Sequence, residues 1–373
     1  MKKIALNYIY LSKNHAGGKD QVGLNLLKGF YENGYTKNMI VFCFDYSKEI
    51  IKSISPDIRI VSIASKSFKS EVLRMIQVSM VNTFVIPGLL KKYGIDIVYH
   101  LSCNNGLRKL TSYSVVIPHD IKAVAHRVIA NVKVPFYKYW IYKVMYYIDF
   151  GHADTIIAIS DTDKSEITQF YPKSSAKVKR IYNPINITPS IKSNEEVEAY
   201  ICAVNLQFHH KNIITLIKAF ELIKDKVNCK LILVGSVPDR VKYLKDYVMK
   251  HNLDNFISFT GFVDEKTMQE IFVNARLYVN PTLYEGFGMT AIEAMICRIP
   301  TLISNIPTNY EITKGMCSYY SPPENEQALA EAIVKCLQTP VDEEKLQNIS
   351  EIINDSYNYI KISKLYYELF LEI

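Results

Sequence analysis

The sequence is poor in the residues on which specialised small folds depend. Its 373 residues include one tryptophan and seven cysteines, and no two cysteines form a Cys-x-x-Cys pair. Zinc sites and disulfide frameworks need clustered cysteines, so neither is expected and the cysteines are predicted to be reduced core residues. Internal repeats and low-complexity segments are also absent. A content of 49% hydrophobic and 22% charged residues indicates a globular chain and not a disordered one.

Long apolar runs are absent as well. No stretch of about 18 consecutive apolar residues occurs, so no transmembrane helix is predicted. Residues 1–10 begin with two lysines near the N-terminus, but their apolar run is short, is interrupted by Asn7 and lacks a small-residue cleavage site. We interpret this stretch as a first β-strand and not as a signal peptide, and we expect a cytoplasmic protein.

Positive charge is scarce in the second half of the chain. Residues 1–185 contain 26 Lys and Arg against 13 Asp and Glu, whereas the remaining residues contain 18 against 24. This asymmetry predicts an anionic partner for the basic half. Residues 133–149 combine Trp140 with tyrosines and lysines, as an interfacial amphipathic helix on an anionic membrane would, although a core helix with tyrosine edges explains them equally well. Residues 66–92 are a second candidate, and no motif indicates nucleic acid.

Length and hydrophobic patterning predict two α/β domains. A chain of 373 residues exceeds what one hydrophobic core usually serves. Short apolar runs alternate with helical patterns, which is typical of parallel sheets with crossover helices, and the breaker-rich stretch 183–193 is the predicted hinge. The predicted strands are 4–10, 39–44, 58–63, 96–100, 114–117 and 155–159, then 200–204, 231–234, 256–259, 277–280 and 301–304.

The most informative stretch is PTLYEGFGMTAIE, residues 281–293, where a strand-like run leads through a glycine-bracketed turn into a helix. Gly286 and Gly288 flank Phe287, so the backbone can approach a ligand closely. The helix opening near Met289 directs unpaired N–H groups and the positive end of its dipole at that ligand, which suits a phosphate.

Two carboxylates, Glu285 and Glu293, frame this turn. Carboxylates bind phosphate poorly but accept hydrogen bonds from sugar hydroxyls, so the combination predicts a nucleotide sugar. Two other interpretations fit parts of the pattern. GFGMTA also matches a degenerate dinucleotide-binding fingerprint, but the following strand, 301–304, is followed by Asn305 and not by an acid. A purely structural turn explains the glycines but not the motifs around them.

Glu285 and Glu293, with seven residues between them, resemble the E-x7-E motif of the GT-B fold retaining glycosyltransferases of family 4, group 1. Further segments similar to that family follow in the family's order: Lys211-Asn212, Val234-Gly235-Ser236, Thr260-Gly261-Phe262-Val263 and Pro300 to Ser304. The resemblance implies a GT-B fold of two Rossmann-like α/β domains facing each other across a cleft. Residues 1–185 would bind the acceptor, residues 186–355 the nucleotide sugar, and a C-terminal helix within 356–373 would cross back to the first domain.

The N-terminal half carries weaker motifs of the same family. Gly17 and Gly18 follow the first predicted strand and precede a helix expected to begin near Asp20 or Gln21. The family places a turn here, against the donor phosphates and the acceptor. His119 and Asp120 follow a strand at the edge where open α/β sheets bind ligands. The resemblance implies that His119 contacts the transferred sugar and that Asp120 lies near the acceptor. Structural roles remain alternatives for both pairs.

Asp161-Thr162-Asp163 spells the D-x-D signature with which another class of glycosyltransferases, the GT-A enzymes, binds a metal. Ser160 before it is a plausible helix N-cap, so we interpret the two aspartates as first-turn charges. We therefore expect no metal and no cofactor. The departing diphosphate would be neutralised by Lys211 and by the amides of residues 286–290.

One position departs from the family pattern. The family usually has an arginine several residues before Lys211, and Asn205 stands there instead, so Lys211 would bear more of the phosphate charge. By resemblance, Glu285, His119 and Lys211 are catalytic and Glu293 holds the ribose. The predicted donor-binding residues are Gly17, Gly18, Asn205, Lys211, Gly286, Phe287, Gly288, Met289, Thr290 and Glu293.

The resemblance implies retaining transfer of a hexose-type sugar from a nucleotide diphosphate sugar to a hydroxyl of a glycan acceptor. A lipid-linked oligosaccharide in bacterial surface polysaccharide assembly fits the aromatic and basic segments, with peripheral contact at the inner face of the cell membrane. Two alternatives stay open: a sugar-nucleotide epimerase with a similar fold, and a non-catalytic partner of another glycosyltransferase.

Overall fold

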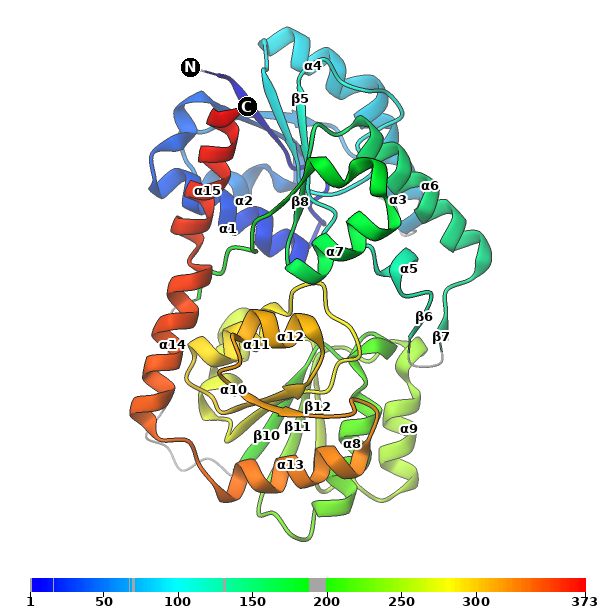
Figure 1. The fold of residues 1–373 in the computed structure, drawn as a ribbon, viewed down its shortest axis with the longest axis vertical. Helices are drawn as coiled ribbons and strands as arrows, with labels where there is room; N and C mark the ends of the chain where they lie inside the picture. Colours follow the sequence, from blue (N-terminus) through cyan, green and yellow to red (C-terminus); the bar gives the residue numbers. More distant parts are fainter. Residues whose placement is uncertain (1, 16, 67, 69–70, 130–131, 188–198) are drawn as a thin grey trace. The chain divides into compact units, whose positions relative to one another are not determined.

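The computed structural model describes residues 2–373 except 16, 67, 69–70, 130–131 and 188–198 (Figure 1). Part of the predicted hinge, 188–193, and Lys69 of the second candidate membrane segment lie outside the described residues. The chain forms two compact units. The first comprises Met1–Arg127, Val134–Asn186 and Tyr357–Ile373, and the second comprises Val128–Lys133 and Ile187–Ser356. Apart from the short segment 128–133, these limits lie within two residues of the domain limits expected from the sequence.

The first unit is built on a seven-stranded sheet whose strand pairs are all parallel. The strand order is β3-β2-β1-β4-β5-β8-β9, so the order reverses between β1 and β4. At this reversal Ile4 of β1 pairs with Met39 on one side and with Ile97 on the other. The strands are β1 (Ile4–Asn7), β2 (Met39–Phe44), β3 (Arg59–Ile63), β4 (Ile97–His100), β5 (Tyr113–Val116), β8 (Thr155–Ala158) and β9 (Val178–Arg180).

Helices cover this sheet and include the last helix of the chain. They are α1 (Gly18–Glu32), α2 (Lys48–Ile54), α3 (Glu71–Met80), α4 (Ile86–Tyr93), α5 (Lys122–Ala125), α6 (Phe136–His152), α7 (Asp161–Phe170) and α15 (Tyr359–Glu372). Helix α15 packs against α1, where the rings of Phe30 and Phe370 lie 6.2 Å apart, and against the sheet through Tyr99 and Tyr366. The prediction that the C-terminal helix joins the first domain is therefore confirmed.

The second unit contains a six-stranded parallel sheet with the order β12-β11-β10-β13-β14-β15. Here the order reverses between β10 and β13. Its strands are β10 (Tyr200–Val204), β11 (Lys230–Val234), β12 (Ile257–Gly261), β13 (Leu277–Asn280), β14 (Thr301–Ser304) and β15 (Ser318–Tyr320). Its helices are α8 (Ile213–Ile223), α9 (Tyr243–Lys250), α10 (Glu265–Asn274), α11 (Met289–Ile296), α12 (Pro307–Thr313), α13 (Glu326–Gln338) and α14 (Glu343–Tyr357).

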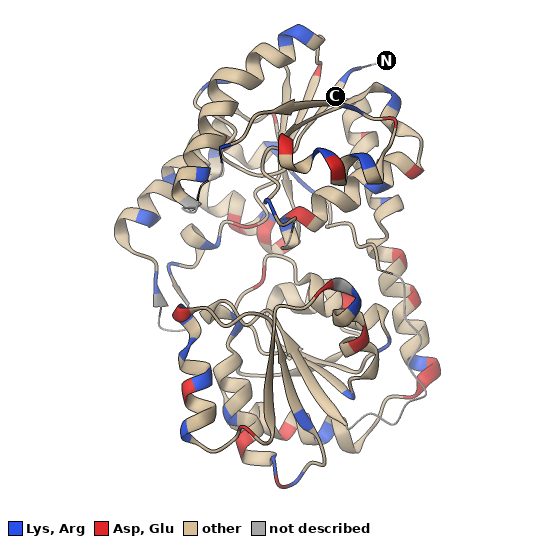
Figure 2. Cartoon of the chain, turned by 180° about the vertical axis from the view of Figure 1, so that it is seen from behind, with Lys and Arg blue, Asp and Glu red and all other residues tan. Residues whose placement is uncertain are grey.

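The central strands of both sheets are almost entirely buried, which explains why their sequences are continuous apolar runs. Figure 2 shows that charged residues lie mainly on helices and loops, while the strands are mostly uncharged. In the second unit, one core cluster joins strand residues such as Leu231 and Val279 to Phe220 of α8 and Leu329 of α13. Each unit therefore has the layered organisation of a doubly wound α/β domain.

The structure contains a long apolar helix that a search for continuous apolar runs does not find. Helix α3, a π-helical segment at Val81–Val85 and α4 run on without a break. Within the described residues, the stretch Val72–Tyr93 is long and apolar enough to cross a membrane by length and composition alone. Arg74, Gln77 and Asn82 interrupt the apolar run without interrupting the helix, so the sequence has no stretch of about 18 consecutive apolar residues there. That no helix spans a membrane stays a prediction.

Candidate active site

The predicted donor residues of the second unit lie at the point where its strand order reverses. Loops leaving the carboxyl ends of β10 and β13 carry residues 205–212 and 281–288. Adjacent strands whose crossovers leave in opposite directions open a crevice at this edge, and open α/β sheets bind ligands there. The topology alone therefore brings Lys211 and Glu285, which are 74 positions apart, to one place.

Lys211 and Glu285 form an ion pair. The Lys211 Nζ donates to Glu285 Oε1 at 2.6 Å, and the side chains are only 13% and 9% exposed. Both charges are thus largely removed from water. A charge in such a site is stable only if it has an oppositely charged partner and hydrogen bonds. The pair places a cation beside a carboxylate at the open edge of the sheet. A cation can bind a phosphate, and a carboxylate can accept hydrogen bonds from sugar hydroxyls.

Hydrogen bonds between the two loops hold this pair in position. Asn212 adopts a left-handed backbone conformation, with φ of 55°, and its side-chain amide donates to the carbonyl oxygens of Pro281 and Pro323. The Thr282 hydroxyl donates to the His210 carbonyl at 3.1 Å, and the Leu283 N–H donates to the same oxygen at 2.8 Å. The lysine loop and the glutamate loop therefore form one connected structure.

The glycine-bracketed turn leads into α11 as predicted. Gly288 is the N-cap residue with φ of 89° and ψ of 47°, and no side chain caps the helix. The Ala291 N–H donates to the Gly288 carbonyl at 3.1 Å, so the Met289 and Thr290 amides are the ones at the helix start that face a ligand site. Behind them the Tyr278 hydroxyl donates to Thr290 Oγ1 at 2.9 Å, which fixes the first turn of the helix. Glu293 lies one turn further along α11 and is partly exposed.

Asn205 occupies the end of β10 at the same edge. It is exposed, its φ is 67°, and its backbone N–H donates to the Val234 carbonyl at 3.1 Å. A left-handed conformation is unfavourable for most side chains but is tolerated by asparagine. Local backbone geometry is therefore one reason for asparagine at this position.

The predicted residues of the first unit lie at the carboxyl edge of its own sheet. Gly17, with φ of 107°, is the N-cap residue of α1, and its backbone conformation is one that side chains rarely adopt. Asp120 follows β5 and accepts a hydrogen bond from the Lys122 N–H at 3.0 Å. Gly17 and Gly18 are both exposed, and α1 begins at Gly18, two or three residues before the start expected from the sequence.

His119 is held in one tautomer. Its Nε2 lies 2.7 Å from the Leu101 carbonyl oxygen, which can only accept, so Nε2 carries the proton and Nδ1 has the free electron pair. Burial lowers the pKa of His119 from 6.5 to about 4, opposed by the Leu101 hydrogen bond and reinforced by the nearby Lys19 charge. His119 is therefore a neutral hydrogen-bond acceptor at neutral pH.

The D-x-D segment is a helix start. Ser160 is the N-cap residue of α7 and accepts from the Asp163 N–H, as predicted. The Asp163 carboxylate accepts from the Ile159 N–H at 3.0 Å, and Asp161 pairs with Arg180 at 2.8 Å. Both carboxylates therefore have protein partners. Among the described residues, no group of three or more His, Cys, Asp or Glu side chains is arranged to bind a metal.

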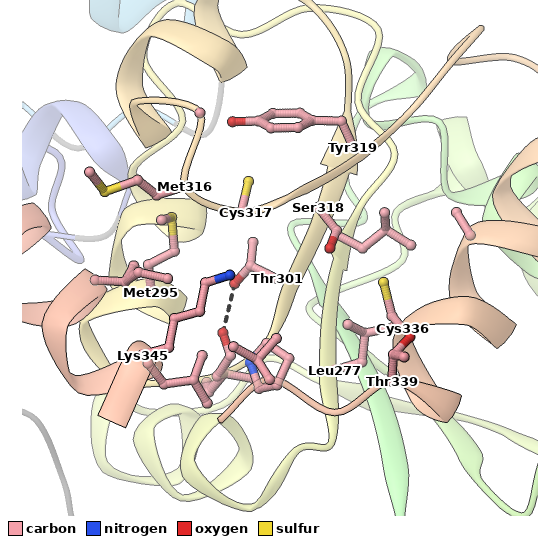
Figure 3. A pocket seen from close by; sticks show the side chains of 18 of the residues that line it. Leu277, Met295, Thr301, Met316, Cys317, Ser318, Tyr319, Cys336, Thr339 and Lys345 are labelled. Atoms are coloured by element: carbon pink, nitrogen blue, oxygen red, sulfur yellow. Dashed lines mark hydrogen bonds between the residues drawn. The ribbon is translucent and has the colours of Figure 1, made fainter. Parts of the chain in front are cut away.

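A cavity of about 620 Å³ also occurs in the second unit (Figure 3). It is lined by Leu277, Thr301 and Ser318, the first residues of β13, β14 and β15, and by Met295 and Lys345. It therefore lies at the amino ends of the strands, and it contains none of the residues predicted for the donor site. We do not assign it to the active site.

Two family models match the chain. Residues 16–188 match the model described as Glycosyltransferase Family 4, and residues 186–354 match the model described as Glycosyl transferases group 1. The O-antigen chain mannosyltransferase RfbU of Salmonella typhimurium is 32% identical over 186 residues, which are 50% of this chain and 51% of the relative. The chain thus spans about half the length of this relative.

Solved structures resemble the chain over its whole length. Sucrose-phosphate synthase from Thermosynechococcus elongatus matches with a TM-score of 0.79 at 18% identity, and each chain is covered completely. Anabaena HepE, solved with UDP and glucose, matches with a TM-score of 0.74 at 17% identity, again over both complete chains. At these identities the likeness concerns the fold. Since the two family models together match residues 16–354, this chain belongs to the GT-B glycosyltransferases, with a family 4 half followed by a group 1 half.

Proposed function

We propose that this protein transfers a hexose-type sugar, with retention of anomeric configuration, from a nucleotide diphosphate sugar to a hydroxyl of a glycan acceptor. The observation that carries the proposal is the buried Lys211–Glu285 pair at the strand reversal, next to the uncapped start of α11. A phosphate there would meet a cation and the start of a helix, and the attached sugar would meet a carboxylate. HepE, whose structure contains UDP and glucose, supports this choice of donor.

The proposed donor roles follow from charge. Lys211 and the amides of residues 286–290 would neutralise the departing diphosphate, which is why we propose a metal-independent reaction. Glu285 would accept hydrogen bonds from donor-sugar hydroxyls and Glu293 from the ribose. His119 would accept a hydrogen bond from the sugar through Nδ1, because Leu101 already holds its Nε2–H.

Thermal unfolding with a panel of nucleotide sugars in the presence of EDTA tests the donor site, because a ligand that binds only the folded state raises the melting temperature. We expect one donor to raise it for the wild type and for the control Glu344→Ala, which changes an exposed glutamate of α14. Glu293→Ala should abolish the shift. No shift with any donor, with or without Mg²⁺, would contradict the proposal.

We further propose that the acceptor is a lipid-linked oligosaccharide of bacterial surface polysaccharide assembly. The similarity to an O-antigen mannosyltransferase supports this context, and so does a large apolar surface on the first unit. Exposed side chains recur every fourth residue along α3 and the π-helical segment, at Val72, Ile76, Met80 and Phe84. A continuous row of exposed apolar side chains on the solvent side of a helix is unusual for a soluble domain.

Helix α6 presents a similar face. Phe136, Trp140, Ile141 and Val144 are exposed, whereas Tyr146 on the opposite side is buried. The Lys143 ammonium lies 5.0 Å from the centre of the Trp140 ring. Large apolar rings combined with lysines are typical of helices that lie in the interface of an anionic membrane. This exposure favours the membrane interpretation of residues 133–149 over a core helix.

The Val72–Tyr93 stretch would lie on the membrane and not span it. Its other face is part of the first unit, since Ile86 and Leu90 are buried and the Asn82 side chain bonds Asn7 and the Asn104 carbonyl. A spanning helix would have to break these contacts and expose buried polar groups to lipid. We therefore propose a cytoplasmic protein bound peripherally to the inner face of the membrane.

Trp140 is the only tryptophan, so its fluorescence reports this contact directly. We expect a blue shift with vesicles containing phosphatidylglycerol, a weaker shift with phosphatidylcholine alone, and a loss of binding at high salt. Ile141→Glu should weaken binding, whereas Leu222→Glu, an equally apolar exposed site on the second unit, should not. An emission spectrum unchanged by vesicles of either composition would contradict membrane contact.

A further inference from the structure

A second crevice lies at the strand reversal of the first unit. Chain segments leaving β1 and β4 diverge there, as β10 and β13 diverge in the second unit. A pocket of about 200 Å³ occupies this place. It is lined by Tyr10 and Lys19 after β1, by Ser102 and Asn104 after β4, and by Pro118 after β5. Ligand sites in open α/β sheets are expected at this position.

Two cations line this pocket, Lys19 from α1 and Arg74 from α3. Arg74 Nη1 is buried and has no hydrogen-bond partner within the described part of the chain. A buried guanidinium nitrogen without an acceptor is costly, and most such groups in native proteins are bonded. The Lys19 ammonium donates to the Tyr10 carbonyl at 2.7 Å, which holds it at the pocket wall. Arg74, one of the two cations of the pocket, therefore has a buried N–H group that a ligand with a hydrogen-bond acceptor could bind.

The acidic groups beside the pocket are bonded elsewhere. The Asp20 carboxylate accepts from the Ser12 N–H at 2.9 Å and from its hydroxyl. Asp149 accepts from the Asn104 N–H at 2.6 Å and from the Asn105 N–H at 3.1 Å. Burial raises the pKa of Asp149 to about 7, so its negative charge is incomplete at neutral pH. Within the described residues, neither carboxylate accepts a hydrogen bond from Arg74, so neither neutralises the Arg74 charge by a direct contact.

The size and position of the pocket limit what it can hold. Whole drug-sized ligands need about 300–1,000 Å³, so a pocket of 200 Å³ holds one group of a larger molecule. Lys19 also acts on His119, whose pKa it lowers, so the pocket adjoins the residue proposed to contact the transferred sugar. Its remaining wall is formed by α3 and α6, through Val78 and Tyr146, and these two helices carry the apolar faces proposed to contact lipid.

We propose that this pocket binds a phosphate group of the acceptor, namely the phosphate that links the glycan to its lipid carrier. Arg74 and Lys19 would each donate charge-assisted hydrogen bonds to the phosphate oxygens. The lipid would leave the pocket between α3 and α6, and the glycan would extend towards His119. This inference rests on the proposed function, because it specifies the acceptor of the same transfer reaction.

Amide hydrogen–deuterium exchange, followed on individual peptides by mass spectrometry, tests the pocket separately from the donor site. Farnesyl diphosphate serves as the probe for a lipid-linked phosphate, with the full chain in solution. We expect slower exchange in peptides covering 72–80 and 101–106. Arg74→Gln and Lys19→Gln should each weaken the apparent affinity roughly ten- to a hundred-fold, the loss expected for one charge-assisted hydrogen bond. Arg59→Gln is the matched control, since Arg59 stacks on Tyr93 away from the pocket.

The remaining outcomes are equally decisive. Protection confined to peptides 205–212 and 283–293 would mean that the probe binds only at the donor site, and would overturn the proposal. Protection of 72–80 by phosphatidylglycerol vesicles but not by farnesyl diphosphate would assign the pocket to a phospholipid headgroup and also overturn it. If no nucleotide sugar slows exchange in peptide 205–212, the proposed donor site is refuted, whereas protection of 72–80 by farnesyl diphosphate would still support the phosphate pocket. The donor site and the phosphate pocket can therefore be refuted separately.

Discussion

Removing the Lys211 charge should destabilise the protein far more than removing a surface lysine. Lys211→Met leaves the Glu285 carboxylate with its partner gone at a site only 9% exposed. Breaking a buried ion pair from one side costs about 3–5 kcal/mol, because the remaining charge stays desolvated. For a unit of this size that loss corresponds to a fall in melting temperature on the order of 10 °C.

A double-mutant cycle separates this effect from lost packing. We expect the double variant Lys211→Met with Glu285→Gln to recover most of the stability in urea unfolding, because neither charge then remains buried. Lys266→Met is the control in the same unit. Its pair with Glu270 is long, at 3.8 Å, and exposed, so its loss should change the free energy of unfolding by about 0.5 kcal/mol or less. Equal losses for Lys211→Met and Lys266→Met would refute the argument that the Lys211 pair is energetically buried.

Three further predictions concern stability. Burial lowers the pKa of His100 from 6.5 to about 3. As the pH falls, the unfolded state therefore binds a proton before the folded state does, and stability should fall by up to roughly 5 kcal/mol between pH 6.5 and 3. His100→Gln should flatten the dependence of melting temperature on pH, and identical profiles for the variant and the wild type would contradict this. Gly288→Ala would combine an unfavourable positive φ with a Cβ only 3.0 Å from Ile312 Cδ1. It should cost more than Gly34→Ala, for which the positive φ alone costs about 1–2 kcal/mol, because the Cβ added at Gly34 meets nothing within 4 Å. Ser160→Ala should cost about 1 kcal/mol as a lost N-cap and leave donor protection in EDTA unchanged, whereas a loss of that protection would point to a donor role for the D-x-D segment.

The sequence predicted the interior strands well because buried parallel strands are continuous apolar runs. Strands β2, β10, β13 and β14 have the predicted limits. The first strand was predicted to reach Tyr10 but ends at Asn7, because the following turn is equally buried and apolar. Edge strands β9 and β15 were missed. Each has three residues, and β9 has only Val178 buried, so neither leaves an apolar run.

The site was predictable as a set of residues but not as an arrangement. Motif order placed Lys211 and Glu285 at one sheet edge, yet their direct pairing depends on the Asn212 and Thr282 hydrogen bonds, which no spacing rule specifies. The Lys211-Asn212 motif gives one indication of this loop conformation, since asparagine tolerates the left-handed backbone found at Asn212. Arg74 was seen only as one charge of a basic segment, because its burial depends on how α3 packs against the loop after β4.

The position of α15 has a consequence for how the chain is made. The core of the first unit includes Tyr366 and Phe370, which are buried in contact with residues of the first hundred. A ribosome delivers these side chains after the rest of the first unit and after residues 187–356, so the first unit cannot close its core until α15 has emerged. The second unit, apart from 128–133, is one continuous segment, 187–356, that emerges earlier. The second unit should therefore complete its fold before the first, which exposes the groove for α15 to chaperones until α15 has been synthesised.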